Sequence, residues 1–249
     1  MTGPLADPVA GSIWSSTRFS EVGPPPIDVA IGLQIDRLDT GWGTKLSNVK
    51  TQLLWQPEAL EFRSIEGRLF DVPVSGSFTL RRQGSLGTYL GKIAVKGVAL
   101  SDLFPRAGLG GSADIQFDGG GSGESLSAFA ASLSGGGQMT ISGLTVPAFD
   151  IDALAATTRA LDNERDPPEL KRVTDMVATG LTRGPLQLAE LSAPLTGSSG
   201  VIRFGPLDAH QGNKGLQGNL SLDMRSLKIE GRIVILSLIH ISEPTRRRG

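Results

Sequence analysis

Short segments in which apolar and polar residues alternate recur along most of this chain of 249 residues. In Ile27–Leu38, for example, Val29, Ile31, Leu33 and Ile35 stand at every second position. A period of two is typical of a β-strand that has one apolar face. Gly, Pro, Asn or Asp stands in most gaps between such segments, which favours an antiparallel meander. The pattern predicts further strands at Leu60–Phe62, Val74–Leu80, Lys92–Val95, Asp114–Phe117, Gln138–Ser142, Val201–Phe204, Leu216–Leu222 and Gly231–Ile235.

The alternating pattern is repeated within the chain. Leu46–Leu80 can be aligned without a gap on Leu188–Leu222, at a constant spacing of 142 residues. After a slip of two residues, Gly91–Val95 aligns with Gly231–Ile235. Apolar positions match while polar positions differ, so the repeated property is a strand pattern with one apolar face. We expect two copies of one β-module: a leading segment at 1–26, a first module at 27–120, a connector at 121–187 and a truncated second module at 188–235.

Helices are expected mainly in the connector. Leu126–Leu133 has apolar residues at the i, i+3, i+4, i+7 spacing of a one-sided helix, and Ser125 before it suits an N-cap. Gly135–Gly137 is predicted to end this helix, because Gly easily adopts the left-handed C-cap conformation. A second helix is expected to begin after Asp152, to be interrupted by prolines and to resume over Lys171–Leu181.

The composition agrees with a mainly β fold. The chain has 33 Gly and only 20% charged residues, as expected for many strands and turns. It has no Cys, which excludes disulfides, thiolate catalysis and Cys-ligated zinc. A net charge of −1 and 5% aromatic residues argue against nucleic acid as a partner. We expect two repeated antiparallel β-modules that form a curved, groove-like sheet with short connecting helices.

The two ends of the sequence need separate interpretations. Residues 1–16 lack the basic start and the apolar stretch of a signal peptide. No run of about 18 apolar residues that would span a bilayer is present. Leu236–Arg246 looks like the in-frame translation of a transposon-end adapter used in preparing sequencing libraries. We therefore expect 236–249 to be a non-native tail and assign no function to its basic residues.

Three stretches carry motifs in a particular order. The first two are "ESLSAFAASLSGGGQMTISG" (Glu124–Gly143) and "PAFDIDAL" (Pro147–Leu154). They are the counterparts of a pattern S-L-x-x-x-x-A-S-L-x-G-x-G, a strand, then G-x-D-(L/I)-x-x-L, with Ala148 in place of the Gly of the last motif. "LQLAELSAPLTGSSGVIRFGPLDA" (Leu186–Ala209) lies downstream, and "KIAVKGVALSDLF" (Lys92–Phe104) lies upstream. In order and spacing these stretches resemble the C-terminal region of the AsmA family.

The resemblance covers about Ile27–Ile235. The departures are the prolines in the second predicted helix and Ala99, where the family often has Asp. The resemblance implies a protein anchored in the bacterial inner membrane by an N-terminal helix, with most of the chain in the periplasm. It also implies a long, taco-shaped β-groove of repeated modules that helps to carry phospholipid toward the outer membrane. The anchor is absent here, as we expect of a truncated fragment.

On this interpretation, the apolar strand faces line a groove that contacts phospholipid acyl chains. The function would be non-enzymatic, and no catalytic residue, metal site or cofactor is expected. The same alternation would also build the filled core of a β-sandwich. The candidate groove residues are Val29, Ile31, Leu33, Ile35, Leu60, Phe62, Phe78, Leu80, Ile93, Val95, Ile115, Phe117, Ile202, Phe204, Leu220 and Leu222.

Two other classes of function remain open. A secreted or surface β-repeat adhesion module would have the same alternation, with a filled core and no lipid path. An enzyme would need clustered carboxylates or exposed aromatic residues. The nearest candidates are Asp150 with Asp152, where Asp152 suits an N-cap, and His210, which is expected in a solvated turn.

Overall fold

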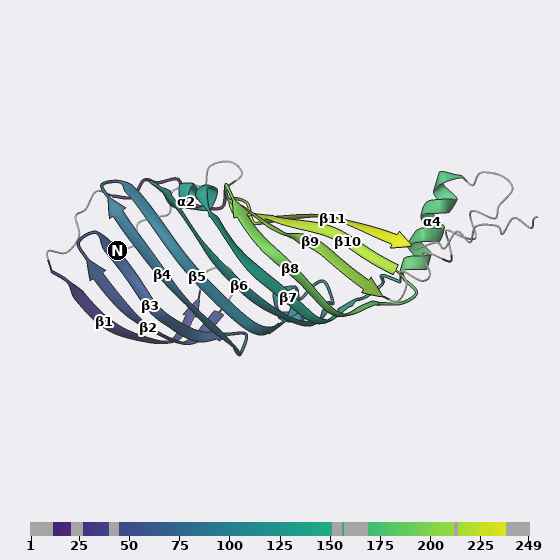
Figure 1. Cartoon of the computed structure of the whole chain (residues 1–249), viewed down its shortest axis with the longest axis horizontal. Helices are drawn as coiled ribbons and strands as arrows, with labels where there is room; N and C mark the ends of the chain where they lie inside the picture. Colours follow the sequence, from purple (N-terminus) through teal and green to yellow (C-terminus); the bar gives the residue numbers. More distant parts are fainter. Residues whose placement is uncertain are drawn as a thin grey trace, which may run out of the picture.

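Eleven strands in the described part of the chain form a single antiparallel sheet, and they lie in it in the order in which they follow along the chain (Figure 1). The computed structural model describes residues 12–20, 27–39, 45–150, 156, 169–211 and 214–237. The strands are β1 (Val29–Asp39), β2 (Lys45–Gln56), β3 (Ala59–Leu69), β4 (Val72–Gln83), β5 (Leu86–Ala99), β6 (Gly110–Gly123), β7 (Ser134–Val146), β8 (Leu186–Ser198), β9 (Val201–Gln211), β10 (Lys214–Asp223) and β11 (Lys228–Ser237). The helices are α1 (Leu100–Leu103), α2 (Leu126–Ser132) and α4 (Leu170–Leu181).

The predicted fold class is confirmed. The chain is mainly β, with short helices and one curved sheet whose edges are β1 and β11. Helix α1 lies between β5 and β6, α2 between β6 and β7, and α4 before β8. Because β7 is a full member of the sheet, the predicted connector contributes a strand to the same sheet as both modules.

Cross-strand pairing places the apolar residues of successive strands on one face of the sheet. Ile31 pairs with Leu53, Leu53 with Phe62, and Phe62 with Phe78. Residues that pair directly across a ladder point to the same side. Followed from β1 to β10, this register puts every candidate groove residue on the same face, which we call the inner face.

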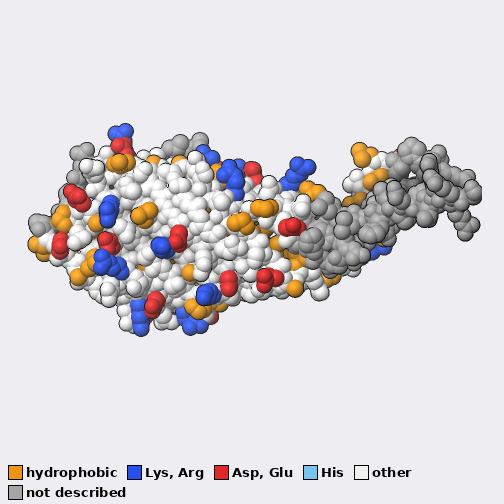
Figure 2. Space-filling view, in the orientation of Figure 1, with side chains coloured by type: hydrophobic (Ala, Val, Ile, Leu, Met, Phe, Trp, Pro, Cys, Tyr) orange, Lys and Arg blue, Asp and Glu red, His pale blue; other side chains and the backbone are white. Residues whose placement is uncertain are grey.

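The opposite, outer face is polar. Lys92 Nζ forms an ion pair with Asp118 Oδ2 at 2.9 Å, and the hydroxyls of Thr140 and Ser192 lie 3.1 Å apart. Figure 2 shows Lys, Arg, Asp and Glu side chains scattered over the face toward the viewer, with hydrophobic side chains among them in small, separate groups. The sheet therefore has one face suited to water and one that must be kept from it.

The internal repeat of the sequence is reproduced in the strand register. Strands β2–β5 and β8–β11 have the same order, and β3 and β9 each carry a bulge at the same point of the repeat. A bulge places extra residues of one strand opposite fewer residues of its partner. The two-residue slip also reappears in the β4–β5 and β10–β11 pairs. In the ladders β3–β4 and β9–β10, the pair Phe62–Phe78 is equivalent to Phe204–Leu220, and the pair Ile65–Gly76 is equivalent to Leu207–Gly218. In the ladders β4–β5 and β10–β11, the pair Phe78–Gly91 is equivalent to Leu220–Gly231.

Helix α2 is confirmed at its start but ends differently from the prediction. The Ser125 hydroxyl accepts a hydrogen bond from the Ala128 N–H at 3.2 Å, as an N-cap does. The helix ends at Ser132, and the following Leu133 has an extended ψ of 126°. Gly135–Gly137 lies in β7, so the prediction that these glycines cap the helix is wrong. Gly135 and Gly137 are needed instead for the close approach of β7 to β6, because an added Cβ at either position would collide with the backbone of β6.

Other predictions concern the second helix and His210. Helix α4 begins at Leu170, as predicted for the resumed helix over Lys171–Leu181. The start predicted after Asp152 lies outside the described residues. His210 belongs to β9, where its backbone pairs with Gly215, so its prediction as a turn residue is wrong. The predicted strands are all present, and all but the first are longer than expected; β2 and β8 are additional.

The inner face is packed solid near the β3–β4 turn and the start of β8. Val98 on β5 and Ala193 on β8 are fully buried, and Leu100 on α1 belongs to the same buried cluster. Leu69 and Phe70, beside the β3–β4 turn, pack against this cluster. This end of the inner face therefore forms a conventional hydrophobic core.

We predict that Gly137→Ala lowers the free energy of unfolding by about 1–3 kcal/mol, because β6 must move to admit the methyl group. A Cβ added at Gly137 would collide with the Gln116 carbonyl oxygen and lie 2.9 Å from the Phe117 Cα. Gly136→Ala is the matched control, since the nearest atom to its Cβ is the Leu195 carbonyl oxygen at 3.7 Å. Urea unfolding followed by circular dichroism measures both variants, and equal stabilities would contradict the prediction.

Candidate functional site: an apolar groove

The inner face contains a cavity of about 570 Å³. Val49 on β2 and Ile65 on β3 line it, together with Leu133, which follows α2. Ile202 on β9 and Met224, just after β10, also line it. Because β2 and β9 are far apart in the strand order, a cavity shared by both requires that the sheet curls around it. The inner face is thus the concave face of the sheet, and its unfilled part is a groove.

A row of glycines crosses the inner face, and two of them, Gly91 and Gly119, line the cavity. The row crosses four neighbouring strands between Phe78 on β4 and Ile202 on β9, and each member pairs directly with the next. Glycine has no side chain, so these positions leave space between the aromatic and aliphatic residues around them. The glycines are Gly91, Gly119, Gly135 and Gly197.

Two of these glycines differ in what surrounds them. A Cβ added at Gly119 would lie 2.9 Å from the Ser134 carbonyl oxygen, so the backbone of β7 requires glycine there. A Cβ added at Gly91 would meet nothing closer than Phe78 Cδ2, at 3.6 Å. Since this is an ordinary van der Waals distance, packing does not require glycine at position 91. The space above Gly91 is part of the cavity.

Five aromatic rings extend from the groove wall to its rim. Phe62 and Phe78 lie 6.4 Å apart, and the Phe78 ring stacks on Tyr89 at 6.2 Å. Phe129 on α2 lies 4.7 Å from Tyr89 and 5.0 Å from Phe19 in the leading segment. The Tyr89 hydroxyl donates a hydrogen bond to the Phe129 carbonyl at 3.0 Å, and burial raises the pKa of this phenol. The aromatic row therefore ties α2 to the groove wall.

The rim beside α2 is held together by backbone hydrogen bonds between segments that are distant in sequence. The Gly200 N–H donates to Leu133 O at 2.9 Å, and the Met224 N–H donates to Gly200 O at 2.8 Å. The Trp14 indole N–H donates to the Met224 carbonyl. The leading segment thus lies along the rim that also carries α2 (Figure 1). Leu133 and Met224 on this rim contribute to the cavity.

Charged groups near the groove are paired or lie at its margin. Lys92 contributes to the lining, but its ammonium pairs with Asp118. At the rim, the Arg225 side chain donates hydrogen bonds to the Asp223 carboxylate and lowers its pKa to about 2. Glu66 also contributes to the lining, from the outer-face side of β3. The lining is otherwise apolar apart from Ser75, Ser77 and the glycines.

The candidate groove residues have three kinds of surroundings. Phe78, Ile93, Phe117 and Ile202 line the cavity. The packed cluster includes Val95 as a buried member and contacts Ile115, Phe117, Phe204 and Leu220. The remaining candidates lie on the same face outside both, with Ile31 42% exposed near the β1 edge. They are Val29, Ile31, Leu33, Ile35, Leu60, Phe62, Leu80 and Leu222.

The sequence pattern did not identify several residues that line the cavity. Val49 lies on β2, which was not predicted as a strand, and Ile65 follows the bulge in β3. Tyr89 is the only tyrosine of the chain and lies just outside a predicted strand. Leu133 was assigned to a helix stripe, and Met224 belongs to a turn. The repeat could have indicated Val49, because it aligns with Leu191 on β8.

The other candidate chemistry of the sequence gains no site in the described residues. Asp152 and the side chain of His210 lie outside the described part of the chain. Within the described ranges, no three His, Asp or Glu side chains group so that they could hold a metal ion. No helix among the described residues is long and apolar enough to cross a bilayer.

Comparison with known proteins finds no match: no family model matches the sequence, and no curated protein or solved structure is significantly similar to the chain.

We predict that Tyr89 titrates above its ordinary value of 10.0, because burial raises its pKa. A raised phenol pKa means that the neutral form is favoured in the folded chain. Its contribution to stability is therefore complete below pH 10 and is lost as the pH rises through the folded-state pKa. Because the chain has one Tyr, tyrosinate absorbance reports on this residue alone. A midpoint equal to that of the urea-unfolded chain would contradict the burial of Tyr89.

Proposed function

We propose that this chain is a non-enzymatic, AsmA-like envelope protein whose groove shelters phospholipid acyl chains as they pass between the inner and outer membranes. The observation that carries the proposal is the apolar cavity on the concave face of a single sheet, lined from β2 to β9. Ligand sites are typically cavities of about 300–1,000 Å³ with mainly apolar linings. The cavity of about 570 Å³ falls in this range.

The lining suits a hydrocarbon more than a polar ligand. Each buried CH₂ contributes about 0.8 kcal/mol, so about ten of them contribute roughly 8 kcal/mol, which corresponds to a micromolar dissociation constant. No specific polar contact is needed for such binding. The two charged residues of the lining, Glu66 and Lys92, lie on the outer-face side of their strands.

The cellular setting in the proposal rests on the resemblance to the AsmA family. It comprises a periplasmic location and an inner-membrane anchor in the parent protein. The expectation of no nucleic-acid partner rests instead on the net charge of −1 and the 5% aromatic residues. The stretch that carries the clearest motif, Glu124–Gly143, forms α2 and most of β7. It also supplies Leu133 to the cavity, so the residues that carry the resemblance help to build the groove.

A specific observation favours the alternative of an adhesion or structural module. The buried cluster around Val98 and Ala193 fills the inner face at one end, as the core of a β-scaffold would. A scaffold alone, however, gives no reason for the unfilled space above Gly91. We therefore prefer the lipid groove, and binding of an acyl probe decides between the two.

The proposal is tested by filling the cavity without disturbing the backbone. In Gly91→Leu the new side chain enters the cavity, and its Cβ makes only ordinary contacts. We expect at least about tenfold weaker binding of dansylundecanoic acid, the loss of roughly 1.4 kcal/mol of burial. Phospholipid that co-purifies with the wild-type chain, detected by native mass spectrometry, should fall in parallel.

Gly32→Leu is the matched control, because it lies on the outer face of β1 and an added Cβ meets nothing within 4 Å. It should bind the probe as the wild type does. If the wild-type chain binds no probe and carries no phospholipid, or if both variants bind equally well, the groove proposal is wrong and the scaffold alternative stands.

A charge placed in the groove provides an independent prediction. Ile93 lines the cavity and is 48% exposed, so Ile93→Glu should fold while placing a carboxylate among apolar side chains. An unpaired charge there opposes entry of a hydrocarbon, and we expect probe affinity to fall by about tenfold or more. Gln116→Glu places the same charge on the outer face and should leave binding unchanged. Equal affinities for these two variants would count against an acyl path beside Ile93.

A further inference from the structure

Residues 12–20 form a strap that crosses from α2 to the turn between β10 and β11. At one end of the strap, the Trp14 indole N–H donates a hydrogen bond to the Met224 carbonyl. Toward its other end, the Phe19 N–H donates to Glu124 O at 2.8 Å, just before α2 begins. The strap therefore holds together two parts of the rim that are far apart in the sequence.

Helix α2 depends on the strap for part of its stability. It is only 7 residues long, and isolated helices of this length are not stable in water. The Ser127 N–H lies in the first turn, where amides have no partner within the helix, and it donates to Ser15 O at 3.0 Å. The Phe19 ring lies 5.0 Å from the Phe129 ring of the helix. Without the strap, α2 would lose a hydrogen bond at its start and an aromatic contact on its side.

Two residues that line the cavity are held in place at this rim. They are Leu133, which follows α2, and Met224. One connection between them is the β8–β9 turn, where the Gly200 N–H donates to Leu133 O and the Gly200 carbonyl accepts from the Met224 N–H. The strap is a second connection, because it binds both α2 and the Met224 carbonyl. No residue of the strap belongs to the described lining, so the strap acts on the cavity only through the residues that it holds.

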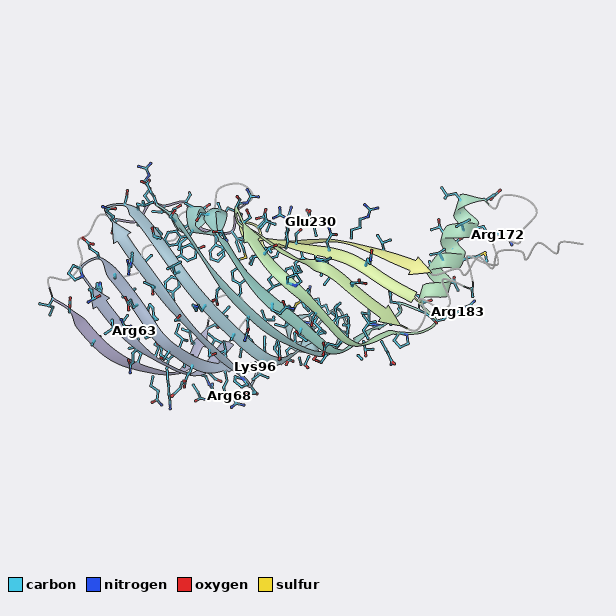
Figure 3. The ribbon with its side chains drawn as sticks, viewed as in Figure 1. Arg63, Arg68, Lys96, Arg172, Arg183 and Glu230 are labelled. Atoms are coloured by element: carbon cyan, nitrogen blue, oxygen red, sulfur yellow. The ribbon has the colours of Figure 1, made fainter. Side chains whose placement is uncertain are left out.

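The rim that carries the strap opens more easily than the opposite end of the inner face. Near that opposite end, where Figure 3 labels Arg68 and Lys96, the inner face is packed solid. Val98 and Ala193 there are fully buried. The strap, by contrast, contains no buried residue and no helix or strand, and its Arg18 side chain is 80% exposed. Segments with few buried contacts open locally at a lower free energy than a packed core.

We propose that the strap is a gate for the groove. While it is bound to α2, Leu133 and Met224 stay together at the edge of the cavity. When it leaves α2, the two residues separate and an acyl chain passes over the rim. This role rests on the proposed function, because the chain that passes is the hydrocarbon that the groove shelters. Since the strap stabilises the empty and the occupied groove equally, it sets the rates of entry and exit and leaves the affinity unchanged.

The first test fixes the strap to α2 with a disulfide tether in the full chain, which has no Cys of its own. The hydroxyls of Ser12 and Ser127 lie 3.4 Å apart, so Ser12→Cys with Ser127→Cys places two thiols side by side. In stopped-flow fluorescence, the oxidised form should take up and release dansylundecanoic acid at least about tenfold more slowly than the reduced form. Thr140→Cys with Ser192→Cys is the matched control, because these hydroxyls lie 3.1 Å apart on the outer face. Its oxidation should leave both rates unchanged.

The second test weakens the strap. Phe19→Ala removes the ring contact with Phe129, and uptake and release of the probe should each become about fivefold faster. The dissociation constant should stay within about twofold of the wild type, because both rates change together. A residue that only shapes the cavity would instead change the affinity. Thr17→Ala is the control on the same strap, since the Thr17 residue is exposed, and it should change neither rate.

Opening of the strap is also measurable without lipid, by hydrogen exchange of backbone amides in folded chains checked by circular dichroism. The Ser127 N–H should exchange faster than the hydrogen-bonded amides of β7, and the oxidised tether should slow it. Exchange at Ser127 that ignores the tether, or equal uptake rates in the oxidised and reduced forms, would overturn the gate alone. So would a Phe19→Ala variant with altered affinity and unaltered rates. A wild-type chain that binds no probe would overturn the proposed function and the gate together.

Discussion

The structure depends on one constraint: every strand must place its apolar residues on the same side of a sheet over which the described residues form no second layer. A shift of one residue in any ladder would turn the apolar set of a strand to the outer face. Bulges interrupt several ladders, but the row of paired residues from Ile31 on β1 to Leu222 on β10 keeps the apolar positions on one face. Because no separate layer of described residues covers the apolar side, the sheet covers it by curling, so that β2 and β9 approach the same space. The curl of the sheet therefore produces both the buried hydrophobic core and the open groove on the inner face.

How far the curl is filled differs along the sheet. Where α1 and the β3–β4 turn lie over the strands, residues such as Val98 and Ala193 lose all contact with solvent. Toward the rim that carries α2, the inner face has the glycine row instead of side chains, and the curl leaves a cavity. The same alternation of apolar and polar residues thus produces a core at one end and a groove at the other. The difference comes from residue size and from which connections cover the strands.

The sequence allowed the fold class, the repeat and the inner-face residues to be predicted, because these follow from local alternation. It failed where alternation is broken by a bulge. In β2 the inner residues Leu46 and Val49 are three positions apart, because Asn48 adopts a left-handed φ of 51°. The equivalent residues of β8, Leu188 and Leu191, have the same spacing. The curl of the sheet and the position of α2 decide which inner-face residues line the cavity. Contacts between residues distant in sequence, such as that of Tyr89 with Phe129, set the curl and the position of α2. No local pattern in the sequence reveals such contacts.

The reason for glycine at position 91 separates an open groove from an imperfect core. Glycine within a strand is less favourable than a β-branched or large apolar residue, so stability alone favours a side chain wherever one fits. At Gly137 none fits, because the backbone of β6 is too close. At Gly91 a side chain does fit, and it would fill the cavity between Phe78 and Phe117. Backbone packing therefore accounts for the first glycine but not for the second. Occupation of the cavity by a hydrocarbon would account for Gly91, since a side chain there would compete with the ligand for the same space.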